Sequence, residues 1–283
     1  MQFQIVIVQP AGYLHSQAFA EIAETLALGF QAIGLEARIT INQLNPSATN
    51  ILLGSHLLEK TAIPYLPDDT VIYNLEQIEP KLFESYGALQ SLFSRFEVWD
   101  YSEANIARLR ALGFDKPIRH LPIGYMPALT RISSAACRDI DVLFYGSINE
   151  RRHAVLSRLK EEGLKIRMLF GVYGAERDGY IARSKVVLNM HLYDPKIFEI
   201  VRVSYLLANR KAVVCEISPE TAIEPDLLAA VQPAAYDDLV DCCRRLVRDD
   251  AARGRLEQAG FRQFSRRNEV DFLQSLMHAR SAD

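Results

Sequence analysis

Three charged residues recur at helical spacing in the second half of the chain. Lys196, Glu199 and Arg202 lie three residues apart, so a helix would place them along one side. Asp194 and Pro195 are residue types that cap and begin helices. Because a helix N-terminus attracts anions, Lys196 beside it would complete a site for a diphosphate. Glu199 could then accept hydrogen bonds from ribose hydroxyls, and Arg202 could hold Glu199 or reach a phosphate; the alternative is a charged stripe that faces water.

A second stretch, FYGSINERR, adds a turn that could bind phosphate. Gly146 and Ser147 follow an apolar run, and successive backbone N–H groups at such a turn form a nest for anions. We expect one of the next two arginines, Arg151 or Arg152, to contact a ligand, with helix-surface charges as the alternative. A further loop at Gly171 could hold a base or ribose, so the candidates for the whole ligand site are Gly146, Ser147, Arg151, Gly171, His191, Lys196, Glu199 and Arg202.

The first half of the chain carries a candidate for proton transfer. His15 lies in PAGYLHSQAF, just after the first predicted strand. Histidine titrates near neutrality, so His15 could take a proton from a hydroxyl group. A structural or helix-capping histidine is the alternative. Further candidates that follow predicted strands are His56, Glu76, Asp100, Tyr101 and Ser102, with loop hydrogen bonding as their alternative role.

Several motifs are absent from the sequence. No G-x-G-x-x-G follows the first predicted strand, and neither a Walker A sequence nor a G-x-S-x-G motif occurs, which argues against a dinucleotide site, a P-loop and a serine hydrolase. Asp139 and Asp141 form a D-x-D pair, but the pair precedes a strand, so we assign it to the start of that strand. The four cysteines lack the spacing of zinc ligands and indicate a reducing compartment. We therefore predict no metal site.

The elements that would position these residues alternate between strands and helices. Predicted strands span residues 4–8, 37–41, 50–53, 70–73, 96–100, 118–122, 141–145, 165–170, 185–190 and 211–216. Predicted helices span 16–34, 81–94, 103–112, 149–163, 175–184, 195–210 and 237–267, the last broken near Gly254 or Gly260. Apolar strands with helical crossovers imply parallel sheets covered on both faces. We predict an α/β fold of two tandem Rossmann-like doubly wound domains, residues 1–130 and 138–283, with a cleft between their strand carboxyl ends.

Composition narrows the classes of function. The chain has 283 residues, of which 49% are hydrophobic and 24% charged, as in ordinary globular proteins. A net charge of −3 argues against a general nucleic-acid binder. The first residues lack the features of a signal peptide, so we expect a cytoplasmic protein. The arginine-rich stretch 244–267 could contact an anionic membrane peripherally, with a solvated helix as the alternative.

These stretches together resemble a known family. FYGSINERR, KIFEIVRVSYLLANRKAVVCE and, in the first half, YNLEQ, VWDYSEAN and LPIGYMP are similar to the bacterial group-1-like glycosyltransferases of the GT-B fold. The resemblance implies transfer of a sugar from a UDP-, GDP- or dTDP-linked donor to an acceptor hydroxyl, with no metal or other cofactor. It implies that Glu199 binds the donor ribose, and His191 stands where many members carry a second glutamate.

The resemblance also assigns roles to the two halves. The first domain would bind the acceptor and the second the nucleotide sugar. In inverting members a base on the acceptor domain takes the acceptor proton; here His15 is the favoured base and Glu76 the other candidate, whereas a retaining member needs no such base. Two alternatives stay open: a sugar-nucleotide epimerase on the same fold, and a non-catalytic module that binds nucleotide sugars. The expected partners are a nucleotide sugar and an acceptor of open identity, and the oligomeric state is open.

Overall fold

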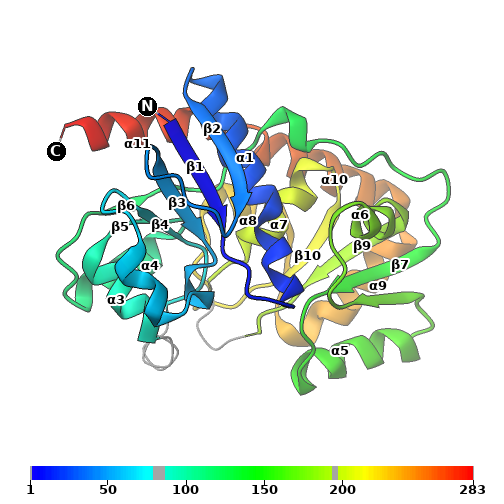
Figure 1. Cartoon of the computed structure of the whole chain (residues 1–283). Coiled ribbons are helices and arrows are strands. Elements are labelled where there is room, and N and C mark those ends of the chain that lie inside the picture. Colours follow the sequence, from blue (N-terminus) through cyan, green and yellow to red (C-terminus); the bar gives the residue numbers. More distant parts are fainter. Residues whose placement is uncertain (1, 79–86, 193–196, 283) are drawn as a thin grey trace. The chain divides into compact units, whose positions relative to one another are not determined.

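The chain divides into two compact α/β units (Figure 1). The computed structural model describes residues 2–78, 87–192 and 197–282. Unit 1 comprises Met1–Met126 together with Asn268–Asp283, and unit 2 comprises Pro127–Arg267. The predicted second domain, 138–283, therefore differs from the observed unit, because the last helix of the chain belongs with unit 1.

Unit 1 contains a six-stranded parallel sheet with the order β2-β1-β3-β4-β5-β6. Its strands are β1 (Gln2–Ile7), β2 (Glu36–Ile41), β3 (Thr49–Leu53), β4 (Val71–Asn74), β5 (Glu97–Asp100) and β6 (Ile118–His120). Every residue of β3 and β4 is buried, as expected for parallel strands covered on both faces. The chain runs from β1 to β2 on one side and continues to β3 on the other. The carboxyl ends of β1 and β3 therefore flank the point where strand order reverses, which is where α/β sheets bind ligands.

Short helices connect and cover these strands. They are η1 (Leu14–Phe19), α1 (Ala20–Ala32), η2 (Ser55–Leu57), η3 (Lys60–Tyr65), α3 (Gly87–Arg95), α4 (Glu103–Ala111) and α11 (Glu269–Ser281). The predicted helix 16–34 is thus two elements, a 3₁₀ turn followed by α1. Of the predicted helix 81–94, residues 81–86 lie outside the described part of the chain.

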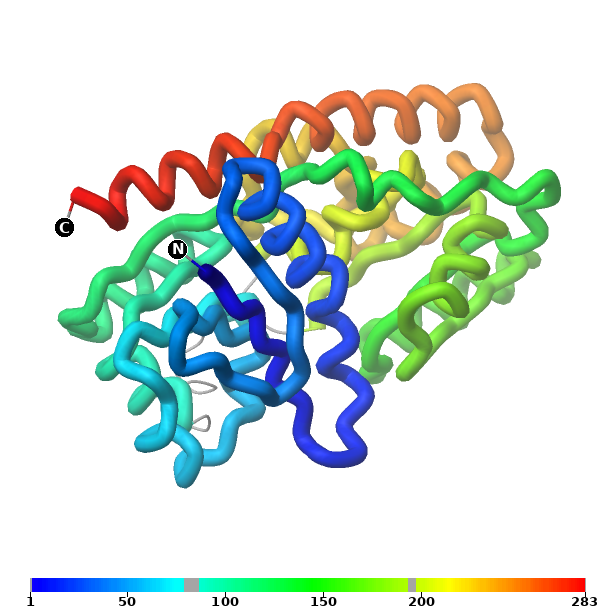
Figure 2. The backbone as a smooth tube through the Cα atoms, turned by 45° about the horizontal axis from the view of Figure 1, so that its top comes forward, coloured from blue at the N-terminus to red at the C-terminus, as the bar shows by residue number. Residues whose placement is uncertain are grey.

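The last helix, α11, packs against α1 of unit 1, as the tube in Figure 2 shows. At Gly29 of α1, a Cβ atom would lie 2.5 Å from Cδ1 of Leu273, so the absence of a side chain there lets α11 approach closely. Glu269 at the start of α11 accepts a 2.7 Å hydrogen bond from the Gly124 N–H, and Arg280 near its end donates to Glu97 of β5. These contacts explain why the C-terminal segment belongs with unit 1.

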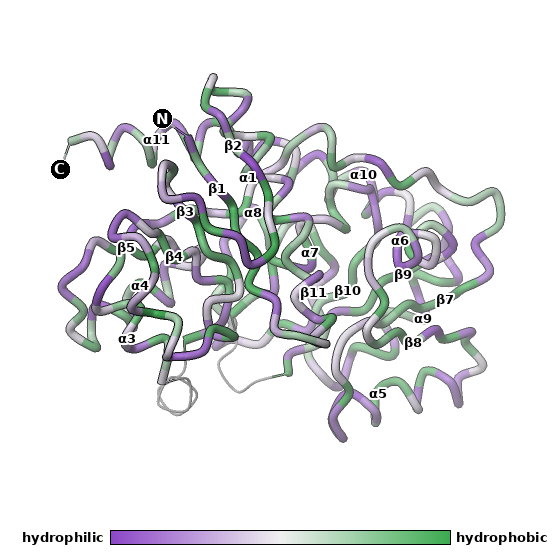
Figure 3. The backbone as a smooth tube through the Cα atoms, viewed as in Figure 1, coloured by the Kyte–Doolittle hydropathy of each residue, from purple (hydrophilic) through white to green (hydrophobic). Residues whose placement is uncertain are grey.

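Unit 2 contains a five-stranded parallel sheet with the order β11-β10-β9-β7-β8. Its strands are β7 (Ile140–Tyr145), β8 (Ile166–Leu169), β9 (Ser184–Asn189), β10 (Ala212–Glu216) and β11 (Gln232–Ala234). Its helices are η4 (Pro127–Leu129), α5 (Glu150–Glu161), α6 (Gly174–Arg183), α7 (Ile200–Ala208), α8 (Pro225–Leu228), η5 (Tyr236–Asp238), α9 (Leu239–Arg248) and α10 (Asp250–Phe264). Strand order reverses between β7 and β9. Figure 3 shows hydrophobic residues concentrated in the strands of each sheet.

The predicted helix 237–267 is broken at a different place from the one expected. Asp249 separates α9 from α10, and its side chain accepts a 2.8 Å hydrogen bond from the Ala252 N–H as the N-cap of α10. Gly254 and Gly260 both lie inside α10. The prediction was wrong because it treated glycine as the breaker, whereas a capping aspartate ends one helix and starts the next.

Candidate functional site

A buried arginine ties together the strand ends where the order of the unit 2 sheet reverses. Arg152 lies in the first turn of α5 and is 1% exposed. Its Nη1 donates a 2.8 Å hydrogen bond to the carbonyl of Ser147, which follows β7. Its Nη2 donates to the carbonyl of Met190, which follows β9, and lies 3.4 Å from Oε1 of Glu199. One cation thus fixes two loops and one carboxylate at the position where this sheet type binds ligands.

Glu199 sits between two guanidinium groups. Besides Arg152, it pairs with Arg202, whose Nη1 lies 2.9 Å from Oε2. The same Nη1 donates to Oδ1 of Asn189 at 3.2 Å. Gly146 gives Arg202 room, because a Cβ at this glycine would lie 3.0 Å from Nη2, and its φ of 127° is a conformation that other residues rarely adopt. The turn after β7 therefore requires glycine both for its backbone conformation and for the space that Arg202 occupies.

A second ion pair lies at the carboxyl end of β10. Glu216 is 3% exposed and accepts hydrogen bonds from both terminal nitrogens of Arg151, 2.6 Å for the Nη1 to Oε2 bond. It also accepts a 3.1 Å bond from the His191 N–H. Burial raises the pKa of Glu216, but the Arg151 guanidinium and the His191 N–H outweigh burial and lower it. Arg151 stacks over the Tyr236 ring, 3.9 Å from Cζ to the ring centroid.

These residues form a cluster that we call the unit 2 cluster: Arg151, Arg152, His191, Glu199, Arg202 and Glu216. Its three arginines against two glutamates leave one positive charge in excess. The cluster lies at the carboxyl ends of β7, β9 and β10, beside the Gly146 turn. Fixed guanidinium groups at such an edge are suited to bind an anion such as a diphosphate.

The structure changes the predicted geometry around Glu199. We expected a helix over 195–210, but α7 begins at Ile200 and Glu199 occupies the N-cap position. Ile197 instead forms a β-bridge with Ala222, and the Phe198 N–H donates to the Ala222 carbonyl at 3.0 Å. The predicted helix start was therefore wrong, because Ile197 and Phe198 pair with the loop after β10, whereas Arg202 does hold Glu199 one turn away. Lys196, Asp194 and Pro195 lie outside the described residues.

The remaining candidates of unit 2 fall in different places. Ser147 contributes its carbonyl to Arg152, and His191 is 3% exposed with Nε2 3.5 Å from Oγ1 of Thr221. Gly171 follows β8 with a φ of 69°; among the described residues, no hydrogen bond or ion pair joins it to the unit 2 cluster. Glu216 was not selected in the sequence analysis. Its position at the end of an apolar strand could have identified it, because Gly146 was selected for following such a strand.

Unit 1 gathers polar side chains at the carboxyl ends of β1, β3 and β4. Nδ1 of His56 on η2 lies 3.8 Å from Oε1 of Glu76, which follows β4. Tyr13 is close enough to Glu76 that this carboxylate, after burial, raises the tyrosine pKa. The His15 ring meets Tyr13 edge to face at 5.1 Å. We call Tyr13, His15, His56 and Glu76 the unit 1 cluster; it brings together two predicted catalytic residues, His15 and Glu76, and His56.

Asp100 has a structural role beneath the Glu76 loop. It is fully buried and accepts hydrogen bonds from Nδ2 of Asn74 at 2.6 Å, from the Ser102 N–H at 2.8 Å and from Nδ2 of Asn105 at 3.1 Å. Both asparagines also donate to the Glu76 carbonyl, each at 2.9 Å. Burial raises the pKa of Asp100 to about 7 against these hydrogen bonds, which lower it. Asp100 and Ser102 thus hold the loop, the alternative considered for them.

Three arginines of the stretch 244–267 form ion pairs. Arg244 contacts Asp241 and Glu162, Arg253 contacts Asp250, and Arg267 contacts Glu224 and Asp226.

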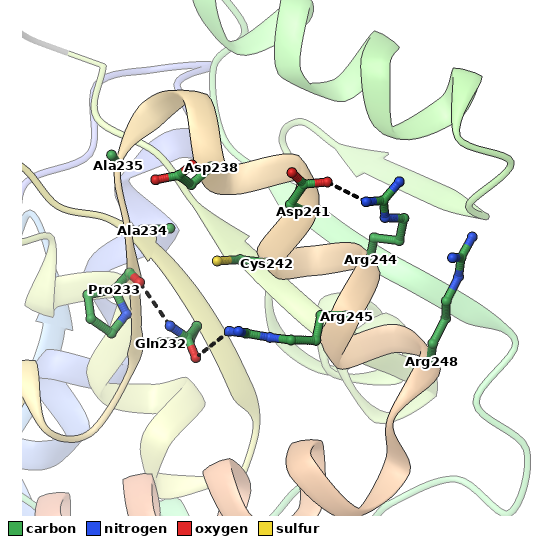
Figure 4. A pocket seen from close by; sticks show the side chains of 10 residues that line it. All are labelled: Gln232, Pro233, Ala234, Ala235, Asp238, Asp241, Cys242, Arg244, Arg245 and Arg248. Atoms are coloured by element: carbon green, nitrogen blue, oxygen red, sulfur yellow. Dashed lines mark hydrogen bonds and ion pairs between the residues drawn. The ribbon is translucent and has the colours of Figure 1, made fainter.

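A surface pocket of about 590 Å³ lies between β11 and α9 (Figure 4). Arg245 reaches across it to Oε1 of Gln232 at 3.1 Å, and Arg244 turns to Asp241. The solvated helix and the peripheral membrane contact both stay predictions.

The described part of the chain contains neither a cluster that could hold a metal ion nor a helix that could span a membrane. Residues 2–78, 87–192 and 197–282 contain no group of three histidine, cysteine, aspartate or glutamate side chains placed to hold a metal ion. Asp139 and Asp141 are paired with Arg183 and Lys185 at the start of β7. In the same ranges, every helix is too short or too polar to cross a membrane.

Comparison with known proteins gives distant sequence relatives. No family model matches the sequence. An uncharacterised protein of Acanthamoeba polyphaga mimivirus is 26% identical over 256 residues, which cover 83% of this chain and 79% of that protein. A second uncharacterised protein of the same virus is 30% identical over 106 residues, 36% of this chain and 12% of that one.

Solved structures resemble the chain over its whole length. Anabaena HepE in complex with UDP-glucose has a TM-score of 0.64 at 11% identity and covers 100% of both chains. Sucrose-phosphate synthase from Thermosynechococcus elongatus has a TM-score of 0.61 at 11% identity, covering 100% of this chain and 99% of that one. T4 phage BGT in complex with its UDP-glucose substrate scores 0.61 at 12% identity, covering 99% of each. This likeness confirms the predicted fold, two Rossmann-like units of the GT-B type.

Proposed function

We propose that the protein is a glycosyltransferase that moves a sugar from a nucleoside diphosphate donor to an acceptor hydroxyl. The observation that carries the proposal is the unit 2 cluster, in which buried Arg152 fixes the loops after β7 and β9 together with Glu199. The switch point of a doubly wound sheet is the position at which such folds bind nucleotides. Proteins of the same fold bind UDP-glucose, as the HepE and T4 phage BGT structures do.

Each residue of the unit 2 site has a role in this proposal. Glu199 accepts hydrogen bonds from ribose hydroxyls, and the arginine pairs keep its carboxylate in place. Arg202 and the backbone at Gly146 and Ser147 hold the diphosphate. The remaining donor-side residues of the proposal are Arg151, Gly171, His191 and Lys196.

The cluster also suits the departure of the diphosphate. When the bond between the sugar and the β-phosphate breaks, negative charge grows on the leaving group, and fixed cations nearby stabilise that charge. Guanidinium groups remain charged at any working pH. We therefore propose that arginines fill the role that a metal ion fills in other transferases, and that transfer does not depend on added metal.

Direct titration of the protein with UDP, GDP and dTDP, each with and without magnesium, tests the donor site. UDP is the first choice because the similar structures bind UDP-glucose. We expect one nucleotide to bind without magnesium. Glu199→Ala should weaken its binding about tenfold, which corresponds to ~1.4 kcal/mol, because the ribose loses its acceptor.

A matched control is Glu162→Ala, which also removes a glutamate paired with an arginine of unit 2, at the surface. It should leave nucleotide affinity unchanged. Equal affinity of Glu199→Ala and wild type would overturn the site assignment. Conversion of the nucleotide sugar to an epimer in the absence of acceptor would instead indicate an epimerase.

A further inference from the structure

The His56–Glu76 pair of unit 1 is built from the ends of adjacent strands. β3 and β4 are neighbours, with Leu53 beside Tyr73, so the residues that follow them meet at one edge of the sheet. His56 Nδ1 and Glu76 Oε1 lie 3.8 Å apart, and their side chains are 11% and 27% exposed. The imidazole of His56 is thus largely buried, and it lies beside a Glu76 carboxylate that is partly exposed to solvent.

The surroundings keep His56 neutral near neutral pH. Burial lowers the pKa of His56, and Glu76, which raises it, is the weaker influence. The Phe19 ring packs against the imidazole edge to face at 6.3 Å. Gly54 permits this approach, because a Cβ there would lie 2.8 Å from Cε2 of Phe19. The apolar wall therefore disfavours the charged imidazolium.

We infer that His56 is a positioning residue for Glu76 in the glycosyl transfer reaction, an inference that rests on the proposed function. Glu76 takes the proton of the acceptor hydroxyl while the acceptor oxygen forms its bond to the sugar carbon. The bond from that carbon to the diphosphate breaks, and its electron pair leaves on the diphosphate. Neutral His56, with its proton on Nδ1, donates to Oε1 of Glu76 and leaves Oε2 to receive the proton. The 3.8 Å separation shortens to a hydrogen bond when the acceptor binds, as catalytic contacts commonly do.

Residues 2–78 and 87–192, as the structure describes them, place further ionisable groups near this pair. Tyr13 and His15 approach from the segment after β1. On α3, which packs against η2, Arg95 is bound to Asp68 and to main-chain carbonyls. On β4, the Tyr73 hydroxyl donates to the Leu121 carbonyl at 2.9 Å.

Protonation of His56 would slow the reaction by making Glu76 a weaker base. An imidazolium beside Glu76 forms an ion pair that stabilises the carboxylate and makes it a weaker base. Activity therefore requires His56 neutral, so its protonation acts on the acid side of the pH profile in the wild type but not in a variant whose side chain cannot ionise. Asp100 also titrates beneath this loop, but it is present in every variant compared and its contribution is common to all.

The test measures release of UDP from UDP-glucose, with water as the acceptor, between pH 5 and pH 9. His56→Asn places an amide donor where Nδ1 stands and cannot ionise, whereas His56→Leu has a similar shape and no donor. We expect kcat to fall about threefold for His56→Asn and about 30-fold or more for His56→Leu, because a misplaced base loses up to roughly 100-fold. The acid limb of the kcat profile should lie at lower pH in His56→Asn than in the wild type, because the amide carries no titrating proton.

Nucleotide affinity separates this inference from the proposed function. Binding of UDP by unit 2 should be the same in the wild type and both variants. If the wild type binds none of UDP, GDP and dTDP, the proposed function fails. If the wild type is active and the acid limb of His56→Asn coincides with that of the wild type, or the Asn and Leu variants lose equal activity with UDP binding intact, the positioning role of His56 is overturned.

Discussion

Two buried carboxylates, Asp100 and Glu216, differ in charge state because their neighbours differ. Asp100 is surrounded by the amides of Asn74 and Asn105 and by an N–H, with no cation among its hydrogen-bond partners. Burial therefore dominates and raises its pKa to about 7. Glu216 has the Arg151 guanidinium in a two-bond pair, which lowers its pKa despite burial. Residue type alone predicts the same behaviour for both.

Asp100 gives stability a pH dependence with a definite sign. The unfolded chain releases this proton near the ordinary value of 3.8, whereas the folded chain keeps it until about pH 7. The folded state thus holds more protons in this window, and the free energy of unfolding should decrease as pH rises from about 4 to 7, by up to about 1.4 kcal/mol per pH unit. Urea unfolding of the wild type and Asp100→Asn across this range measures the difference.

Asp100→Asn carries no titrating proton and should lose that component of the slope. It should also be destabilised by about 1–3 kcal/mol at pH 4, because its amide faces the donors that Asp100 accepts from. Asp115→Asn, an exposed change in the same unit, is the control and should keep the wild-type slope. An identical slope in wild type and Asp100→Asn would contradict the raised pKa.

At the scale of elements, α10 shows why a glycine inside a helix can have opposite consequences. Gly260 is buried where a Cβ would lie 2.5 Å from the Ala230 carbonyl oxygen and 3.1 Å from Cδ2 of Leu207. Gly254, in the same helix, has open space around the corresponding position. The first glycine allows α10 to pack against the segment before β11; the second has no such contact.

The two glycines therefore predict changes of opposite sign. Gly260→Ala should lower the free energy of unfolding by about 1–3 kcal/mol, because the methyl group meets main-chain atoms that cannot rotate away. Gly254→Ala should raise it by about 0.5–1 kcal/mol, because alanine favours a helix. Thermal or urea unfolding followed by far-ultraviolet circular dichroism measures both. Equal effects of the two substitutions would show that α10 does not pack as described.

At the scale of the whole molecule, unit 1 is completed by residues that follow unit 2 in the chain. Leu273 of α11 is fully buried and packs at Gly29 of α1. Arg280 pairs with Glu97, 183 residues earlier. The first unit of the fold therefore contains residues from both ends of the sequence.

This arrangement predicts that a C-terminal substitution unfolds the N-terminal sheet. Leu273→Ala should destabilise unit 1 by about 2–5 kcal/mol through the cavity it leaves. Trp99, the one tryptophan in the sequence, is fully buried in β5 of unit 1, so its fluorescence reports that unit. The urea midpoint of Trp99 fluorescence should fall in Leu273→Ala and stay near the wild-type value in Ser275→Ala, an exposed position of the same helix. An unchanged midpoint in Leu273→Ala would place α11 outside the unit 1 core.

Local sequence predicted the positions of the strands and helices more accurately than the contacts between residues far apart in the chain. Apolar runs placed ten of the eleven described strands within one or two residues and missed β11, because strand preferences depend on neighbouring side chains. The GT-B fold and the turn at Gly146 followed from the same patterns and from the resemblance. The start of α7 did not, because Ile197 and Phe198 pair with Ala222, a contact between residues far apart in the chain.

Spacing along the chain anticipated the Arg202–Glu199 pair, but only the tertiary structure decided which other charges meet. The sequence nominated Arg151, Glu199 and Arg202, but the pairs Arg152–Glu199, Arg151–Glu216 and His56–Glu76 join residues brought together by strand order. Sheet order determines which strand ends are neighbours, and burial determines which side chains need a partner. Both arise from packing across the whole unit, so spacing along the chain cannot specify them.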